Sequence, residues 1–128
     1  MILDSSAILS VLFEEEGHGR VVDALDTADI LAIGAPTLFE TGMVAVGAFD
    51  LYGRGLVSQF LERWNVLVTP FEVRHWQVAA DAFVRYGKGR HPARLNYGDC
   101  MTYATARLAD MPLLYVGGDF GQTDIPSA

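Results

Sequence analysis

Short apolar segments that alternate with helix-like segments are the feature of this 128-residue sequence that most restricts its fold. The first apolar run ends at Asp4, and similar runs cover residues 30–33, 66–69 and 113–116. Short, continuously apolar runs are typical of strands that are buried on both faces of a parallel sheet. Because helices separate the runs, the sequence predicts an α/β domain with helices on both faces of the sheet.

The segments between these runs carry helix signals. Ser5 and Ser6 are suited to cap a helix that continues to Phe13, and apolar residues around 21–25 predict a second, short helix. Longer helices are predicted over residues 36–49, 71–86 and 97–109, with Asn96 as the cap of the last. Gly53 and Gly55 are interpreted as a break before helical spacing resumes at residues 57–64.

Composition predicts one cytoplasmic domain that spans residues 1–128. Hydrophobic residues make up 51% of the chain and charged residues 20%, which favours a large core over disorder. Cys100 is the single cysteine, so an internal disulfide is excluded and a reducing compartment is expected. No signal peptide or membrane-spanning apolar run is recognisable, so we expect a soluble protein.

The charge is unevenly distributed along the chain. The net charge of −7 argues against a domain that binds nucleic acid over its whole surface. Yet Arg85, Lys88, Arg90 and Arg94 lie within ten residues, and no acidic residue occurs between Asp81 and Asp99. This basic segment, Gly87 to Arg94 with Arg85 before it, is predicted to be a loop that binds a polyanion locally.

Two acidic residues follow predicted strands. Asp4 comes directly after the first apolar run, and Asp119 comes a few residues after the run 113–116. Each is separately explained as a cap or turn residue. In parallel α/β sheets, however, ligands bind beyond the carboxyl ends of the strands. Both residues are therefore candidates for a site at that edge.

Two further acids lie on otherwise apolar helices. Glu40 is the only charged residue between Ala35 and Phe49, and a lone carboxylate is costly to bury unless it is paired or binds a cation. Asp99 lies near the start of the helix after Asn96, where it resembles one half of a capping box. Capping and metal binding are compatible, because the positive end of a helix favours a carboxylate.

Together the four acids predict a cation site. Carboxylates that crowd together raise one another's pKa and become protonated unless a cation neutralises them. Oxygen ligands favour Mg²⁺ or Mn²⁺. Histidine ligands are not expected, because His18, His75 and His91 are isolated and have no zinc-type spacing.

Several segments carry a family resemblance that runs nearly from end to end. They are MILDSSA at 1–7, APTLFE at 35–40, YGKGRHPARLNYGDC at 86–100, GDF at 118–120 and TDI at 123–125. With these segments the chain resembles the PIN-domain ribonuclease toxins of the VapC type, which occur in bacterial toxin–antitoxin pairs. The long segment is specific, whereas the opening motif is weak when taken alone.

The resemblance implies a fold, a site and partners. The implied fold is a three-layer α/β/α PIN-like domain with a mostly parallel sheet of 4–5 strands. The implied Mg²⁺ or Mn²⁺ site is formed by Asp4, Glu40, Asp99 and the acid of the Gly-Asp-Phe stretch, Asp119, with help from the Ser6 hydroxyl. The implied partners are a structured RNA such as tRNA or rRNA, a second copy of the chain, and a VapB-type antitoxin whose C-terminal segment inserts near the site.

The hypothesis for the activity is hydrolysis of RNA phosphodiester bonds. Asp4 and Asp99 would bind the metal directly, while Glu40 and Asp119 complete its shell or orient water. The four basic side chains of the loop segment would hold the RNA backbone, or an acidic antitoxin tail in competition with it: Arg85, Lys88, Arg90 and Arg94.

One position departs from the family pattern. Relatives often carry two adjacent acids where this chain has Gly118 and Asp119. If Gly118 replaces the functional acid, Asp119 or, as a less favoured choice, Asp124 has to serve as the fourth carboxylate. The alternative is a catalytically weakened PIN domain that acts only as an antitoxin-binding partner.

Two other protein classes fit the sequence poorly. A haloacid-dehalogenase-like phosphatase also begins with a strand and an aspartate, but its chemistry needs a second acid where Ser6 stands. A response-regulator-like receiver needs paired early acids and a late lysine, and the only lysine, Lys88, lies in the basic loop.

Overall fold

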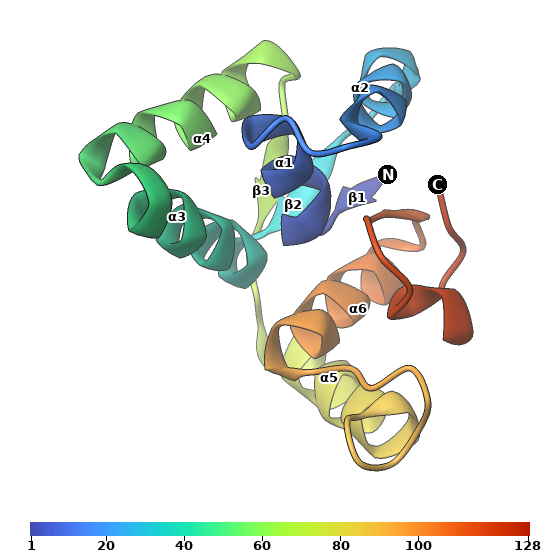
Figure 1. Cartoon of the computed structure of the whole chain (residues 1–128). Coiled ribbons are helices and arrows are strands. Elements are labelled where there is room, and N and C mark those ends of the chain that lie inside the picture. Colours follow the sequence, from blue (N-terminus) through green and yellow to red (C-terminus); the bar gives the residue numbers. More distant parts are fainter.

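A parallel four-stranded sheet lies at the centre of the computed structural model, which describes residues 1–128 (Figure 1). Its strands are β1 (Ile2–Leu3), β2 (Ala32–Gly34), β3 (Leu67–Thr69) and β4 (Leu113–Leu114). Their order in the sheet is β3-β2-β1-β4, and all three pairings are parallel. The prediction of a parallel sheet interleaved with helices is therefore confirmed.

Six α-helices surround the sheet. They are α1 (Ser5–Leu12), α2 (His18–Thr27), α3 (Ala35–Phe49), α4 (Leu51–Arg63), α5 (Val73–Tyr86) and α6 (Tyr97–Ala109), followed by the 3₁₀ helix η1 (Phe120–Gln122). None of these helices is long and apolar enough to cross a membrane. The helix predicted over residues 97–109 has the same bounds as α6, because Asn96 caps it through a hydrogen bond from the Asp99 backbone N–H.

Two apolar clusters lie on opposite faces of the sheet. Successive strand residues point to opposite faces, so Ile2 joins the cluster formed with α5 and α6, whereas Leu3 joins the cluster formed with α1, α2 and α4. Leu113 and Leu114 are divided in the same way. The fold is thus the expected three-layer α/β/α arrangement, with one core above the sheet and one below it.

The parallel register brings the carboxyl ends of the strands to one edge. Ile2 pairs with Ala32 on one side and with Leu113 on the other. Asp4 continues this alignment, since its backbone N–H donates to the Leu114 carbonyl at 3.0 Å. Chain segments that follow β1, β2 and β4 therefore leave the sheet side by side, which places α1, α3 and the segment after β4 around one edge.

Two sequence-based boundaries were wrong. The predicted break at Gly53 and Gly55 lies inside α4, and the chain turns instead at Asp50, whose φ of 51° is left-handed. A Cβ atom at Gly53 would overlap with the Ala45 carbonyl, so this glycine allows α3 and α4 to pack closely rather than ending a helix. The strand expected at residues 30–33 is shifted to β2, because Ile30 lies at the exposed amino end of the sheet.

Replacement of Gly53 by alanine is expected to destabilise the protein by about 1–3 kcal/mol or more, because the added methyl meets rigid backbone instead of a movable side chain. Gly55→Ala is the matched control in the same helix, since a Cβ at Gly55 meets no atom within 4 Å. Urea unfolding should show a lower midpoint for Gly53→Ala and an unchanged or higher one for Gly55→Ala. Equal midpoints would contradict the close packing of α3 and α4.

Candidate active site

Asp4 is held rigidly at the end of β1. It caps α1, and its Oδ2 atom accepts hydrogen bonds from the Ser6 backbone N–H at 3.0 Å and from the Ser6 hydroxyl at 2.6 Å. The Ser6 oxygen in turn accepts from the backbone N–H of Val116 at 3.0 Å. Ser6 therefore connects Asp4 to the segment after β4 and orients its carboxylate, which is only 5% exposed.

Glu40 reaches the same edge from α3. Its carboxylate lies against Gly98 at the start of α6, so closely that a Cβ atom on Gly98 would be 2.7 Å from each carboxylate oxygen. Burial, followed by the charges of Asp4 and Asp99, raises the pKa of Glu40, and a hydrogen bond with the Ser5 side chain opposes this rise. Glu40, the only charged residue of α3, thus faces Asp4 and Asp99.

Asp99 lies at the first turn of α6. Its Oδ2 atom accepts from the Asn96 backbone N–H at 2.8 Å, and its own N–H donates to Asn96 Oδ1 at 3.0 Å, which completes the capping box. Burial raises the pKa of Asp99, the hydrogen bond from the Asn96 backbone lowers it, and the charges of Asp4 and Asp119 raise it further. Capping and contact with the other acids therefore coexist at this residue.

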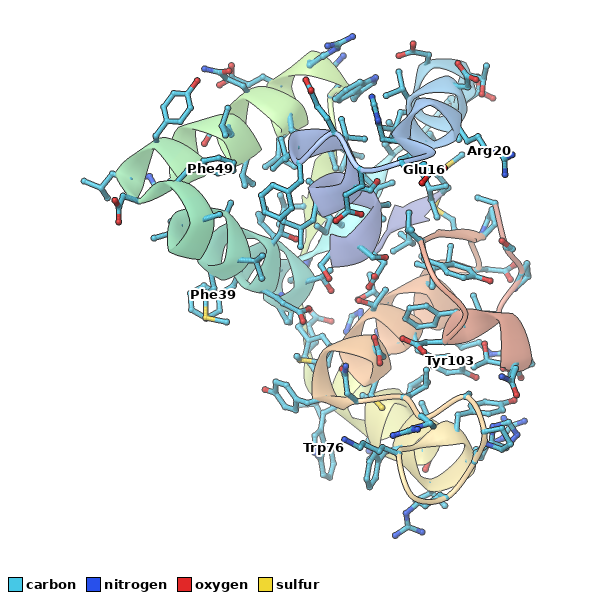
Figure 2. The ribbon with its side chains drawn as sticks, viewed as in Figure 1. Glu16, Arg20, Phe39, Phe49, Trp76 and Tyr103 are labelled. Atoms are coloured by element: carbon cyan, nitrogen blue, oxygen red, sulfur yellow. The ribbon has the colours of Figure 1, made fainter.

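Asp119 and Asp124 have different surroundings. Asp119 is exposed beyond the Gly117 turn, and its charge acts on Asp99. Asp124 accepts a hydrogen bond from the Tyr103 hydroxyl at 2.7 Å and pairs with Arg85 and Arg107 at 3.7 and 4.0 Å. The Tyr103 hydrogen bond is the main cause that lowers the pKa of Asp124. Asp124 thus ties the C-terminal segment to α6, beside the labelled Tyr103 of Figure 2.

Four carboxylates consequently surround one edge of the sheet: those of Asp4, Glu40, Asp99 and Asp119. Their donor atoms are all hard oxygens, which suit Mg²⁺ or Mn²⁺ rather than zinc. No three His, Cys, Asp or Glu side chains are close enough together in this structure to hold one ion between them. The carboxylates therefore fit such an ion by their donor chemistry and charge, and not by a preformed cage of ligands.

The basic loop adjoins the site through the chain itself, because it leads directly into Asn96 and α6. Lys88, Arg90, His91 and Arg94 line an open hollow of about 490 Å³ with no apolar residue in its wall. Arg85 is separate from the hollow. It pairs with Asp124, and its guanidinium lies 5.0 Å from the centre of the Tyr86 ring, which makes it a structural residue of α5.

Sequence reasoning missed several residues that shape this edge. Ser5, predicted only as a helix cap, and Gly98, Thr37 and Thr102 were not predicted as part of the site, although each lies within three residues of a predicted acid. The position of Gly98 directly before Asp99 was the one available signal. The Thr37–Thr102 contact joins residues 65 positions apart, so no local pattern indicates it.

The raised pKa values predict how stability depends on pH. Folded Glu40 and Asp99 retain protons above their ordinary pKa values of 4.5 and 3.8, so the folded state binds more protons than the unfolded state. Their contribution to the free energy of unfolding is therefore present at low pH and is lost as pH rises through the raised pKa values. The lowered pKa of Asp124 acts in a different window, because its stabilisation is lost only as pH falls below 3.8.

Urea unfolding of metal-free protein between about pH 4 and pH 7 measures this slope. We expect the double variant Glu40→Gln and Asp99→Asn to remove the decline that these two groups cause. A slope that is the same in the variant and the parent would contradict the raised pKa values of Glu40 and Asp99, whose main cause is burial.

Comparisons with known proteins show the family to which the chain belongs. The PIN domain family model matches residues 1–126. Ribonuclease VapC36 of Mycobacterium tuberculosis is 41% identical over 126 residues, which cover 98% of this chain and 91% of the relative. The chain therefore belongs to the PIN-domain family and, within it, to the VapC ribonucleases.

Solved structures share the fold at low sequence identity. The sarcin–ricin loop cleaving toxin VapC20 of M. tuberculosis superposes with a TM-score of 0.80 at 14% identity, covering 99% of this chain and 97% of that one. A toxin–antitoxin complex from Klebsiella pneumoniae gives a TM-score of 0.72 at 18% identity, covering 96% and 92%. Both likenesses confirm the PIN-like α/β/α fold.

Proposed function

We propose that this chain is the toxin of a type II toxin–antitoxin pair and acts as a Mg²⁺- or Mn²⁺-dependent endoribonuclease. The observation that carries the proposal is the gathering of the acids at the edge where parallel α/β sheets bind ligands: the charges of Asp4 and Asp99 act on Glu40, and those of Asp4 and Asp119 act on Asp99. Membership of the VapC ribonucleases supports RNA as the substrate.

Each acid has a separate task in the proposed site. Asp4 and Asp99 are held by hydrogen bonds at a strand end and a helix start, so they are suited to hold the ion. A bound divalent ion lowers the pKa of water and neutralises charge on the attacked phosphate. Glu40 and Asp119 would complete the ligand set and orient the attacking water. In that hydrolysis the water oxygen would bond to phosphorus as the P–O bond of the leaving nucleotide breaks, and a proton of the water would end on the leaving oxygen. Ser6 acts on Asp4, which it orients.

The basic hollow supplies the RNA contact. Lys88, Arg90 and Arg94 offer three cations in the loop that leads into α6, on an otherwise acidic protein. Contacts of this kind bind phosphates without sequence preference and weaken with salt. Arg85 contributes less than the other three, because it already pairs with Asp124.

Exposed apolar side chains support the proposed protein partners. Phe39 on α3 is 69% exposed and Trp76 on α5 is 64% exposed, and both point away from the protein in Figure 2. Phe39 shares α3 with the exposed side chains of Met43 and Val46, and neighbouring exposed apolar side chains support a protein–protein contact there. The fold likeness to a toxin–antitoxin complex supports an antitoxin as one partner, and a second copy of the chain is the other.

Cleavage of RNA by the isolated protein tests the proposal. Protein freed of antitoxin is incubated with total RNA and Mg²⁺ or Mn²⁺, with EDTA and with the Asp4→Asn variant as parallel controls. Asn is a good helix cap, so the variant keeps α1 capped. The proposal requires cleavage that depends on the ion and disappears in the variant. Cleavage that persists with EDTA, or in Asp4→Asn, would overturn it.

Substitution of the two late acids separates an active site from a weakened one. We expect Asp119→Asn to reduce cleavage about 10-fold or more, the size of effect seen for groups that support a metal site, with little change in stability. Asp124→Asn should instead lower the unfolding midpoint, because the two arginines lose a charged partner and the hydrogen bond from Tyr103 loses its ionised acceptor. If Asp119→Asn cleaved as the parent does, the site would lack its fourth carboxylate, and a mainly antitoxin-binding role would be favoured.

A further inference from the structure

We infer that the buried hydroxyl pair Thr37–Thr102 is a positioning device that sets the separation between Glu40 and Asp99. This inference rests on the proposed function, because it assigns the two threonines to the carboxylate site. Thr37 Oγ1 and Thr102 Oγ1 are 2.9 Å apart, and both residues are almost completely buried. The pair is therefore a direct hydrogen bond between α3 and α6 that water does not reach.

Helical periodicity places the Thr37–Thr102 hydrogen bond about one helical turn from both carboxylates. Thr37 precedes Glu40 by three residues on α3, and Thr102 follows Asp99 by three residues on α6. Residues three apart lie on the same face of a helix, one turn from each other. The two helices contact each other, and their contacting stretches run antiparallel, because Gly34 before α3 lies against Thr105 whereas Gly98 at the start of α6 lies against Glu40. The hydroxyl pair and the acids thus occupy adjacent layers of one interface.

A hydrogen bond is suited to this position because it depends on distance and direction. Apolar contacts between two helices tolerate small sliding movements, whereas a hydroxyl pair is lost once its oxygens separate. The repulsion between Glu40 and Asp99 acts to push α3 and α6 apart at the layer above. Because Gly98 has no side chain, the Glu40 carboxylate lies close to the start of α6. The hydroxyl pair keeps α3 and α6 at the separation that this contact needs.

Neighbouring threonines show that the bond between the helices is specific to this pair. Thr41 Oγ1 donates to the Thr37 carbonyl at 2.8 Å, and Thr105 Oγ1 donates to the Met101 carbonyl at 3.0 Å. Both bonds stay within one helix. Thr41 is as buried as Thr37, and Thr105 as Thr102, so the two pairs differ mainly in where their hydroxyls point. Thr41→Val and Thr105→Val are therefore matched controls.

Mn²⁺ binding to the purified, metal-free chain tests the inference without an RNA substrate. Titration followed by the electron paramagnetic resonance of free Mn²⁺ gives the dissociation constant for each variant. We expect Thr37→Val and Thr102→Val to bind Mn²⁺ about 10-fold more weakly, as is found for residues that orient metal ligands. Thr37→Ser keeps the hydroxyl and should bind as the parent does, and the two control variants should also match the parent.

The double variant Thr37→Val/Thr102→Val separates positioning from simple stability. A single valine leaves one buried hydroxyl unpaired, whereas two valines replace both partners with apolar groups of similar shape and are nearly neutral for folding. Positioning predicts that the double variant regains the parent's urea midpoint but still binds Mn²⁺ about 10-fold more weakly.

The possible outcomes are distinguishable. Mn²⁺ affinity that recovers together with the urea midpoint in the double variant would overturn the positioning role, and so would equal loss in the Thr41→Val and Thr105→Val controls. Failure of the parent protein to bind Mn²⁺ would overturn the metal site of the proposed function, and the positioning role with it. Strong binding by the parent and by all valine variants would overturn the positioning role alone.

Discussion

Replacement of Asp99 by asparagine is expected to reduce RNA cleavage by more than about 100-fold, beyond the usual effect of losing a residue that only supports metal ligands. Asp99 combines a place in the first turn of α6 with the charges of Asp4 and Asp119 acting on it. Asparagine has the same shape and keeps an oxygen that can accept the Asn96 N–H, so the capping box survives. The loss of activity is then a loss of charge at the site.

The same substitution should stabilise the metal-free protein near neutral pH. Burial and neighbouring acids raise the pKa of Asp99, so its ionised form is disfavoured in the folded state. A neutral side chain removes that cost. Thermal unfolding with and without Mn²⁺ measures both effects: the variant should start from a higher midpoint and gain less from the ion. A variant that cleaves RNA normally, or that gains as much from Mn²⁺ as the parent, would contradict a direct role for Asp99.

Gly98→Ala is expected to reduce cleavage nearly as much as Glu40→Gln does, without lowering stability. The new Cβ atom would lie 2.7 Å from both carboxylate oxygens of Glu40, so the end of this side chain has to move away from α6. Movement of a flexible side chain costs the fold little, and alanine is favoured over glycine in helices by roughly 0.5–1 kcal/mol. Activity and stability should therefore change in opposite directions.

Gly55→Ala is the matched control for this experiment. Gly55 also lies within a helix, but a Cβ atom there meets no atom within 4 Å. Initial cleavage rates and thermal midpoints of the two variants are compared with those of the parent. If Gly98→Ala and Gly55→Ala cleaved RNA equally well, the contact between Glu40 and α6 would be irrelevant to the reaction.

The local sequence correctly predicted the bounds of elements that depend on residues close together in the chain. The bounds of α6 follow from Asn96 and the helical pattern after it, because a cap satisfies backbone donors that have no other partner. The sheet follows from short apolar runs, which are typical of buried strands. β1, β2 and β4 are buried as expected, whereas Leu67 and Val68 of the edge strand β3 are exposed. From the same pattern, Asp4 was recognised as the end of β1 before its surroundings were known.

Packing between helices and exposure at the end of the sheet explain the two predicted bounds that were wrong. Gly53 was interpreted as a break because glycine disfavours helices, yet the close packing of α3 against α4 requires a residue without a side chain there. The start of β2 was misplaced because an apolar residue at a sheet end, Ile30, looks the same in sequence as a buried one. Both outcomes depend on where an element packs in the fold, which the apolar pattern of the segment does not indicate.

Asp4, Glu40 and Asp99 are candidates from sequence alone, since each is a carboxylate at a strand end or on an apolar helix. Only the tertiary structure decided how they meet, because α3 and α6 approach through residues that are 65 positions apart. It also separated Asp119 from Asp124, because the hydrogen bond from Tyr103 and the two arginines commit Asp124 to the C-terminal segment. Sequence thus determined which acids were available, and packing at the sheet edge determined which of them face one another.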